Sequence, residues 1–386
     1  MLVSALVFWV AVGCVFYAYA GYPLAIVILG FVVRRTVKKD TFEPTVTFLI
    51  TAYNEEKDIV EKLENTLSLD YPPGKFQIVV ASDGSSDRTE ELVKGFAGHP
   101  SGVPVVCHRV EGRLGKTAAQ NSAVEVATGE IVIFSDAASL YDKGAIRAFV
   151  QNFADASVGA VSGRCEYVVK KGTSVGGATK AFWALENFIK QQQTRISTLT
   201  GCTGCIYALR KALYTPLPPS IISDLVEPLT VLQQGTRIVY EPGAVAYEET
   251  AGTAGDEFKM RIRVIVRGMN GMAFVKHLYN PLRYPWVAFQ LVSHKVMRWL
   301  VPVFAIVAIV ASAVAAAQGS RFFQVVTALQ AAFYVIAAAG WKLEKKGMRL
   351  GPLKIPVYFC VVNLASLISI FKFMKRENIV VWQTQR

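Results

Sequence analysis

Polar residues that could bind a ligand stand directly after four short apolar segments of this chain. Carboxylates in such positions can hold a cation or take a proton, and a lysine can neutralise an anion. The segments and the residues after them are 45–52 before Tyr53-Asn54-Glu55-Glu56, 76–82 before Asp83-Gly84-Ser85-Ser86-Asp87, 103–108 before Arg113-Leu114-Gly115-Lys116, and 130–135 before Asp136.

These apolar segments alternate with stretches that have a helical pattern. The first, TVTFLITA, is short and rich in β-branched residues, as a buried strand should be. Helical patterns follow over about 56–69, from about 87 and from about 116. This β-α-β-α-β-α-β alternation predicts an α/β domain with a doubly wound, mostly parallel sheet. Ligands bind beyond the carboxyl ends of strands in such sheets, so the four polar groups predict a single crevice, which a tight turn at Gly84 and Ser85 does not explain.

Two common nucleotide-binding motifs are excluded. No G-x-G-x-x-G follows the first apolar segment, so a Rossmann dinucleotide site is poorly supported. Gly115-Lys116-Thr117 looks like the end of a P-loop, but Val110 occupies the position of the first glycine. The Walker A spacing therefore fails, and an ATPase is not indicated.

Composition indicates a membrane protein with a soluble domain between its apolar ends. Hydrophobic residues make up 52% of the chain, the mean hydropathy is +0.35 and the formal net charge is +12. Many basic residues flank the apolar runs, where cytoplasmic membrane loops collect Lys and Arg and where anionic lipids would attract them. Aromatic and basic residues are not interleaved as in nucleic-acid grooves, so no nucleic-acid partner is expected.

Cysteines are not expected to form a metal site or a disulfide framework. Cys202 and Cys205 form a C-x-x-C pair, but they have no second pair and no clustered histidines. A zinc site is therefore not indicated, and small buried residues in a tight turn are the better interpretation.

The N-terminal apolar run, residues 1–35, is predicted to be a transmembrane helix. It is almost uncharged, long enough to cross about 30 Å of hydrocarbon, and lacks the basic start and cleavage site of a signal peptide. Arg34-Arg35 and Lys38-Lys39 follow it, which predicts that the domain over 40–255 is cytoplasmic. The expected location is a bacterial-type inner (plasma) membrane.

Three further apolar runs are predicted to be C-terminal transmembrane helices within 298–375, before a tail over 376–386. They cover about 300–317, 322–339 and 355–370. Lys342, Lys345, Lys346 and Arg349 mark the loop between the last two as cytoplasmic. Lys372, Lys375 and Arg376 follow the last run, against the charge rule for a fourth crossing. Either this run is re-entrant or interfacial, or the rule is overridden.

The segment 256–297 mixes arginines with Phe, Trp, Tyr and Met. This composition suits amphipathic helices that lie in the membrane interface. An ordinary pair of surface helices on the soluble domain is the alternative.

The four polar loops, in this order, resemble the family 2 glycosyltransferases with a GT-A fold. The similarity runs from about residue 46 to the C-terminus and is closest to membrane-bound relatives of the cellulose, hyaluronan, chitin-oligosaccharide and poly-N-acetylglucosamine synthases. The resemblance implies that Ala52, Tyr53 and Glu55 hold the nucleotide base. It also implies that Asp83 contacts the base or ribose and that Lys116 neutralises a diphosphate. A lysine at a helix start is electrostatically unfavourable alone, so a bound anion would explain Lys116.

The family's D-x-D motif corresponds to Asp136-Ala137-Ala138, where Ala138 replaces the second acidic residue. Asp136 is the expected contact to the ribose or to a hydrated metal ion. Mg²⁺ needs only one or two carboxylates beside substrate phosphates and water, so Mg²⁺ or Mn²⁺ is the expected cofactor.

On the acceptor side, the resemblance implies roles for a glycine-rich loop and an acidic residue. Gly201 to Tyr207 matches the glycine-rich loop, and glycine there lets the backbone approach a sugar, which makes Gly204 and Cys205 acceptor-side residues. Asp224 matches the family's general base; alternatively, it is a carboxylate that complements a helix dipole. Glu227 is a second candidate base outside the motif.

Arginines occupy the position of the synthases' Q-x-x-R-W motif, over residues 261–268, without its Gln and Trp in register. Arg261 and Arg263 are expected to contact the diphosphate. The altered motif leaves the processivity of the chain open.

The resemblance implies an inverting hexosyltransferase that uses a nucleotide-diphosphate sugar, with UDP as the nucleotide. The favoured hypothesis is synthesis of a β-linked exopolysaccharide, coupled to translocation through the membrane. One alternative is a single addition to a lipid-linked acceptor, and another is a non-catalytic transporter or scaffold. The expected partners are the donor, a glycan or lipid-linked acceptor and membrane lipids; the oligomeric state is not determined.

Overall fold

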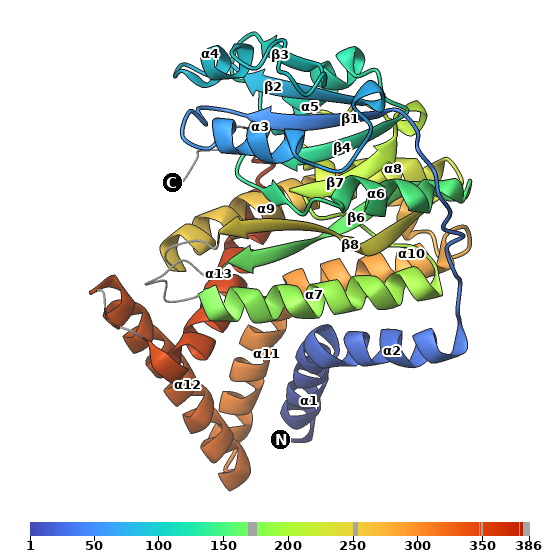
Figure 1. Cartoon of the computed structure of the whole chain (residues 1–386). Coiled ribbons are helices and arrows are strands. Elements are labelled where there is room, and N and C mark those ends of the chain that lie inside the picture. Colours follow the sequence, from blue (N-terminus) through green and yellow to red (C-terminus); the bar gives the residue numbers. More distant parts are fainter. Residues whose placement is uncertain (169–175, 250–253, 347, 349, 378, 381–386) are drawn as a thin grey trace.

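A computed structural model gives the fold of residues 1–386, described everywhere except 169–175, 250–253, 347, 349, 378 and 381–386. Eight strands form one sheet within the described residues (Figure 1). Along the chain they are β1 (Val46–Ala52), β2 (Phe76–Asp83), β3 (Val105–Val110), β4 (Ile131–Asp136), β5 (Leu140–Tyr141), β6 (Val158–Val168), β7 (Ile206–Arg210) and β8 (Arg237–Glu249).

The order of the strands across the sheet is β3-β2-β1-β4-β7-β6-β8-β5. The first four are parallel to one another, which confirms the predicted doubly wound half. The other half is mixed: β7 is antiparallel to β4 and β6, β8 is parallel to β6, and β5 is antiparallel to β8. The topology switches at β4, so the predicted mostly parallel sheet carries an added mixed part.

Helices cover both faces of this sheet, and we call the sheet with these helices the sheet domain. They are α3 (Ile59–Leu67), α4 (Thr89–Lys94), α5 (Lys116–Val126), α6 (Ala145–Val150), α7 (Gly176–Ile196) and α8 (Ser223–Gln233). One core lies under α3, α4 and α6, and a second lies under α5 and α8. The seven residues of β1 are buried because both faces are covered, which explains its continuous apolar sequence.

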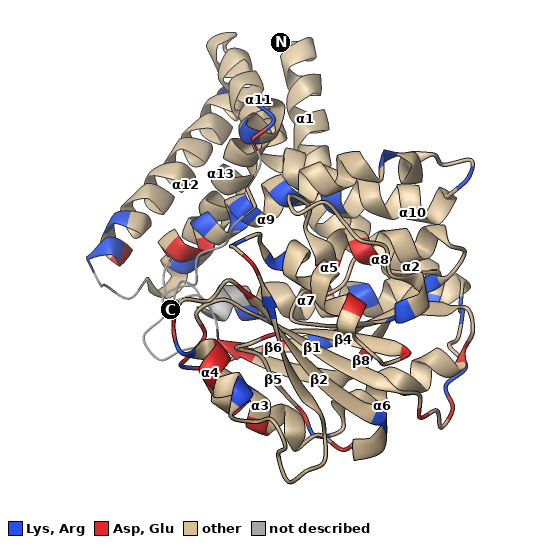
Figure 2. Cartoon of the chain, turned by 90° about the horizontal axis from the view of Figure 1, so that it is seen from above, with Lys and Arg blue, Asp and Glu red and all other residues tan. Residues whose placement is uncertain are grey.

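The remaining helices lie beside the sheet domain (Figure 1). They are α1 (Leu2–Phe16), α2 (Tyr22–Val32), α9 (Ala254–Phe274), α10 (Pro285–Gln290), α11 (Met297–Ala317), α12 (Arg321–Lys345) and α13 (Lys354–Met374). Of these, α1, α11 and α12 project away from the sheet domain. Four helical stretches in the described residues are long and apolar enough to cross a membrane: Leu2–Val32, Pro285–Ala317, Arg321–Lys345 and Gly351–Met374. Figure 2 shows that Lys and Arg gather where these helices approach the sheet.

The expected single helix over residues 1–35 is two helices in the structure. A π-helical segment, Tyr17–Gly21, separates α1 from α2, and the chain bends sharply there (Figure 1). Phe8 and Ala11 of α1 pack on α11, whereas α2 runs along α7. Helix α1 points away from the sheet domain, whereas α2 does not (Figure 1), and the 15 residues of α1 span about 22 Å.

The segment 256–297 forms α9, a short 3₁₀ helix, α10 and a second π-helical segment, Leu291–Val296. The last two continue directly into α11. Of the α-helices in the segment expected to be interfacial, only α9 is not part of a membrane-length helical stretch.

Helix α13 begins beside the end of α12 and packs on α9 near its own end, and the chain after it reaches the sheet domain. A Cβ at Gly340 near the end of α12 would lie 2.6 Å from Val357 Cγ2, so the two helices are tightly packed there. The Ser369 hydroxyl donates a 3.4 Å hydrogen bond to the carbonyl of Ile262 in α9. Val380, beyond α13, lies against Gly115. Arg349, one of the basic residues expected in the preceding loop, is outside the described residues, as is much of the tail over 376–386.

We expect the C-terminus of α13 to lie on the same side of the membrane as the sheet domain. An impermeant maleimide should then label Lys375→Cys and the sheet-domain control Lys143→Cys in vesicles that expose this domain, each in a Cys107→Ser background. Ala317→Cys, at the far end of α11, should react only after detergent is added. Labelling of Lys375→Cys in the pattern of Ala317→Cys would show that α13 crosses the membrane.

Candidate functional site

The four polar loops meet at one edge of the parallel half of the sheet. Ala52 at the end of β1 pairs with Ser82 of β2, and Thr51 pairs with Asp136 of β4. Asp83 pairs with Val110 at the end of β3. The loops after these strands therefore lie side by side, as the alternation of strands and helices predicts.

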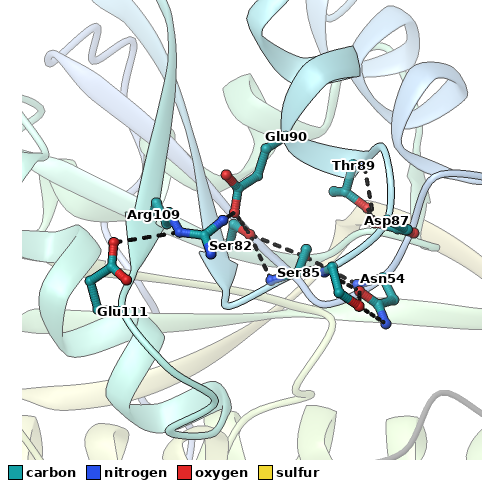
Figure 3. Close-up of polar contacts among 9 residues, drawn as sticks. Asn54, Ser82, Ser85, Asp87, Thr89, Glu90, Arg109 and Glu111 are labelled. Carbon is teal, nitrogen blue, oxygen red and sulfur yellow. Dashed lines mark hydrogen bonds and ion pairs between the residues drawn. The ribbon is translucent and has the colours of Figure 1, made fainter.

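Hydrogen bonds hold the loops after β1 and β2 together (Figure 3). The Asn54 side-chain carbonyl accepts a 2.8 Å bond from the Ser86 amide, and the Asn54 amide donates to the Ser85 hydroxyl at 3.1 Å. Asn54 has a φ of +52°, which asparagine tolerates better than most residues. The Asp87 carboxylate accepts from the Glu56 amide at 3.1 Å. These hydrogen bonds fix the loop after β1 against the loop after β2.

A second set of contacts in Figure 3 fastens β2 to β3. The Ser82 hydroxyl and the Arg109 guanidinium each donate a 2.7 Å hydrogen bond to the Glu90 carboxylate. Arg109 also lies 3.5 Å from the more exposed Glu111. Because Glu90 is nearly buried, this pair holds the outer strands of the parallel half in place.

Asp83 is buried and holds the loop that carries Lys116. Its carboxylate accepts hydrogen bonds from the Leu114 amide at 2.8 Å and from the Gly115 amide at 3.0 Å. Burial raises the pKa of Asp83, and these two amides partly offset that effect. Gly115 has a φ of +95°, so the turn needs glycine. In this structure Asp83 therefore organises the loop, and its expected contact with base or ribose stays a prediction.

An aromatic and a guanidinium group stack at the entrance to the crevice. The Arg113 guanidinium carbon lies 3.9 Å from the centre of the Tyr53 ring. Ala52 is fully buried directly before Tyr53, and the Glu55 amide donates to the Thr89 hydroxyl at 2.8 Å. A planar base could stack on this pair. Arg113 was not among the expected site residues, although it stands in one of the four polar loops.

Lys116 joins the donor-side and acceptor-side elements. Its ammonium group forms an ion pair with Asp136 and donates a 3.2 Å hydrogen bond to the carbonyl of Gly204. A Cβ on Gly204 would lie 2.8 Å from Asp224 Oδ2, so a side chain at this position would displace the carboxylate. Four of the expected residues, Lys116, Asp136, Gly204 and Asp224, are thus brought together.

Charges at this junction act on one another. Burial works against the charged form of Lys116, but Asp136 and Asp224 outweigh it and raise the pKa of Lys116. Burial also raises the pKa of Asp224, Lys116 opposes this shift, and Asp136 adds to it. A carboxylate with a raised pKa is a better proton acceptor, so Asp224 has the properties of a general base.

Glu227 is placed differently from Asp224. Its carboxylate accepts hydrogen bonds from the hydroxyls of Tyr207 at 2.7 Å and Tyr214 at 3.3 Å, and the side chain is buried. Burial raises the pKa of Glu227 to about 7, although the two hydroxyls oppose this effect. These contacts suit a structural role for Glu227.

The arginines of α9 face different sides of the helix. Residues two apart are rotated by about 200°, so Arg261 and Arg263 point to opposite faces. The Arg261 guanidinium binds Glu257 at 2.7 Å and the hydroxyl of Tyr358. Burial lowers the pKa of Arg263, and the carboxylate of Asp136 partly offsets this effect. Arg263 thus lies toward the junction, and Arg261 toward α13.

Arg267, which the sequence did not single out, supports the loop before α8. Its guanidinium donates to the carbonyl of Ile221 at 2.7 Å and to the hydroxyl of Thr117 at 2.9 Å. It therefore links α9 to the start of α5 and to the loop that leads to Asp224. Its spacing of four residues from Arg263 was the available signal, because such residues share a helix face.

Two buried lysines were also missed, and both anchor loops of the site. The Lys62 ammonium donates to the carbonyl of Ser139, just after Asp136, and lies 4.3 Å from the centre of the Tyr141 ring. Burial lowers the pKa of Lys62 to about 7. The Lys190 ammonium donates to the hydroxyl of Thr203 in the glycine-rich loop. Both lie on amphipathic helices, where sequence alone does not separate a buried lysine from a solvated one.

The role of Asp136 as ligand of a divalent cation stays a prediction, and in this structure its carboxylate is paired with Lys116. The partner of Asp136 in the family motif is absent at Ala138, so donor phosphates and water would complete the coordination. In a separate cluster among the described residues, Cys165, Cys205 and Glu248 bring their ligand atoms within 4.8 Å of one another. Cys205 of the C-x-x-C pair belongs to that cluster and Cys202 does not.

Residues 47–215 match the family model for glycosyl transferase family 2. The poly-beta-1,6-N-acetyl-D-glucosamine synthase of Staphylococcus aureus (strain COL) is 28% identical over 225 residues, which are 56% of this chain and 53% of the relative. The same-named enzyme of Staphylococcus epidermidis is 26% identical over 225 residues, with the same coverage. The chain spans about half the length of the curated relatives it matches.

A solved structure has the same fold over almost the whole chain. It is the mannosyltransferase PcManGT from Pyrobaculum calidifontis in complex with GDP-Man and Mn²⁺. The TM-score is 0.74 at 22% identity, and the match covers 96% of this chain and 100% of that one. The shared fold extends beyond the 47–215 match into the helices that follow the sheet.

The raised pKa of Glu227 predicts a pH-dependent stability. Between its ordinary value of 4.5 and about 7 the folded protein retains a proton that the unfolded chain releases. The stability of the wild type should therefore fall, relative to Glu227→Gln, as the pH rises through this range. The limit is about 1.4 kcal/mol per pH unit.

Melting temperatures in detergent, measured at about pH 5 and about pH 8, test this linkage. The difference between variant and wild type should move in favour of Glu227→Gln by about 2–4 °C for each kcal/mol. A difference that does not change with pH would mean that Glu227 is ionised in the folded protein throughout.

Proposed function

We propose that this chain is a glycosyltransferase with a family 2 catalytic domain, and that it builds a β-linked exopolysaccharide from a nucleotide-diphosphate sugar by direct displacement with inversion. The observation that carries the proposal is the approach of Asp224 to Gly204, beside the Lys116–Asp136 pair. A proton acceptor and a diphosphate-neutralising cation thereby face one space.

On the acceptor side, Asp224 takes the proton of the attacking hydroxyl. The hydroxyl oxygen forms a bond to the anomeric carbon of the donor while the bond from that carbon to the diphosphate breaks. Attack from the face opposite the diphosphate converts an α-linked donor to a β-linked product. The backbone of the glycine-rich loop lies close to Asp224 at Gly204, where a side chain would crowd the carboxylate.

On the donor side, negative charge develops on the departing diphosphate. Lys116 is the nearest cation of the crevice to Asp136, and Arg263 extends the positive charge from α9. Cations placed in advance at such a position stabilise the transition state more than the ground state. The nucleotide base would stack beside Tyr53 and Arg113, whose planar groups already lie together.

A divalent cation, Mg²⁺ or Mn²⁺, would be held by Asp136 and donor phosphates and would supply further charge neutralisation there. The structural neighbour holds Mn²⁺ together with GDP-Man, which supports this part of the proposal. UDP is the proposed nucleotide of the donor, as the resemblance to the synthases implies.

The proposed location is the inner membrane of a bacterial-type cell, with the sheet domain in the cytoplasm. Arg34, Arg35, Lys38 and Lys39 after α2 support this orientation. Coupling of synthesis to translocation through the helices is part of the proposal.

A single addition to a lipid-linked acceptor is the second candidate. Arg261, in the position of the synthases' arginine motif, is directed to Glu257 and Tyr358 instead of to the crevice. The transporter or scaffold hypothesis is not retained, because the domain is that of an enzyme.

Removing the proposed base should abolish transfer but leave donor binding. We expect Asp224→Asn to lower the transfer rate at least about a hundredfold, the usual contribution of general base catalysis. Glu227→Gln, three residues away, is the matched control and should retain most of the activity. Transfer rates and donor affinity, measured by equilibrium titration, check both expectations. Full turnover by Asp224→Asn would exclude Asp224 as the base.

Product size decides between the two candidate functions. Purified enzyme would be incubated with UDP-glucose, UDP-N-acetylglucosamine and GDP-mannose, each with Mg²⁺, with Mn²⁺ or with a chelator. The proposal expects one sugar to give a long β-linked glycan in a metal-dependent reaction. A product that carries one added sugar would support the lipid-linked alternative, and full activity with the chelator would remove the metal from the mechanism.

A further inference from the structure

A basic pocket lies where the chain leaves α2, among helices and strands that form no part of the donor crevice described above. Its volume is about 480 Å³, which suits a small ligand or a lipid headgroup. The walls come from the segment 34–39, from the last turns of α7 and from β8.

Positive charge dominates this pocket. Arg34, Arg35, Lys39 and Arg195 line it, and none of the lining residues is acidic. Lys39 is paired with Glu241, whereas the three arginines form no ion pair with a carboxylate within the part of the chain that the structure describes. All three arginines are exposed, so their guanidinium groups are available to an anion.

A buried arginine beneath the pocket adds to the positive charge. Arg237 is 4% exposed and donates hydrogen bonds to the carbonyls of Thr194 at 3.0 Å and Thr36 at 3.3 Å. Burial, together with Arg35, lowers the pKa of Arg237 to about 10, so it remains charged at neutral pH. Its bonds fasten the segment after α2 to the end of α7, which gives the pocket a defined shape.

The surface next to the pocket is apolar. One face of α2 packs on α7 through Tyr22 and Ile26. The opposite side exposes large apolar side chains, with Phe31 72% and Val32 79% exposed directly before Arg34. An apolar helix face that ends at a cluster of arginines has the arrangement by which proteins bind a membrane surface.

We propose that this pocket binds the phosphate headgroup of an anionic phospholipid, whose acyl chains lie along the exposed face of α2. A guanidinium group can donate two parallel hydrogen bonds to the oxygens of a phosphate. The pocket offers three exposed arginines for such bonds. The adjoining apolar face selects a lipid over a soluble phosphate or nucleotide, because neither of those has a part that could cover it.

The bound lipid would hold the sheet domain at a fixed orientation to the membrane. Arg195 lies on α7, and the same helix carries Lys190, which binds Thr203 in the glycine-rich loop. A lipid at one end of α7 is therefore connected through one rigid helix to the acceptor side of the junction. This inference does not depend on the sugar or the acceptor of the enzyme.

Lipid binding to the purified full-length chain tests the proposal. Native mass spectrometry in neutral detergent would count bound phosphatidylglycerol, with phosphatidylcholine as the zwitterionic comparison. Arg34→Gln with Arg195→Gln removes two pocket charges. Lys342→Gln with Lys345→Gln, at the end of α12, is the matched control with the same loss of charge. We expect the pocket variant to bind phosphatidylglycerol roughly tenfold or more weakly and the control to bind as the wild type does.

The result is interpretable even if the double variant is less stable. Arg195→Gln alone changes one exposed side chain and should give a smaller loss in the same direction. Equal losses in the pocket variant and the control would overturn the proposal, since they would show attraction to net charge alone. Equal binding of phosphatidylcholine, or displacement of the lipid by inorganic phosphate or UDP at matching concentration, would also overturn it.

Discussion

The contact of Lys116 with Asp136 and Gly204 joins the parallel half of the sheet to its mixed half. Asp136 ends the last strand of the parallel half, and Gly204 precedes β7, the first strand of the mixed half. The buried Asp83 carboxylate holds the turn before Lys116 through two backbone amides and so fixes the position of the lysine. Replacing Lys116 by a neutral residue would leave Asp136 and the nearby Asp224 without their shared cation. A partly buried charge that loses its partner destabilises the folded protein.

A second set of buried polar contacts joins the sheet domain to the membrane-length helices. Glu186 of α7 forms an ion pair with Arg298 at the start of α11 and lies 3.3 Å from His294 in the π-helical segment before it. Gln193, two turns farther along α7, donates a 2.7 Å hydrogen bond to the hydroxyl of Tyr22 in α2. Because these groups are buried, they lose more than their hydrogen bonds if the helices separate. Helix α7 therefore connects the membrane-length helices to the glycine-rich loop, which it contacts through Lys190 and Thr203.

Features that depend on neighbouring residues along the chain were predictable. The four parallel strands, the helices between them and the polar groups after them follow from periodicity and from the rule for strand ends. Strand-end position and motif resemblance single out Asp83, Lys116, Asp136 and Asp224 in the sequence. The structure brings the last three to one junction and gives Asp83 the task of holding the loop before Lys116.

Features that depend on contacts between distant segments were not predictable. Arg261 and Arg263 look alike in the sequence, yet only the docking of α9 against α13 and α8 decides which of them faces Asp136. The charges after α13 conflicted with a fourth crossing, and its packing on α9 offers a way to satisfy the charge rule.

The sequence by itself determined a membrane-associated α/β protein with a polar crevice at the ends of four strands, because periodicity and strand-end chemistry are local properties. Tertiary structure decided that the sheet has a mixed second half and that Asp224 meets Gly204. It also decided that Asp83 holds the backbone of a loop and that arginines from two distant segments share one pocket. Each of these depends on which distant surfaces pack together, and that choice is made by burial of the whole chain and not by any short pattern within it.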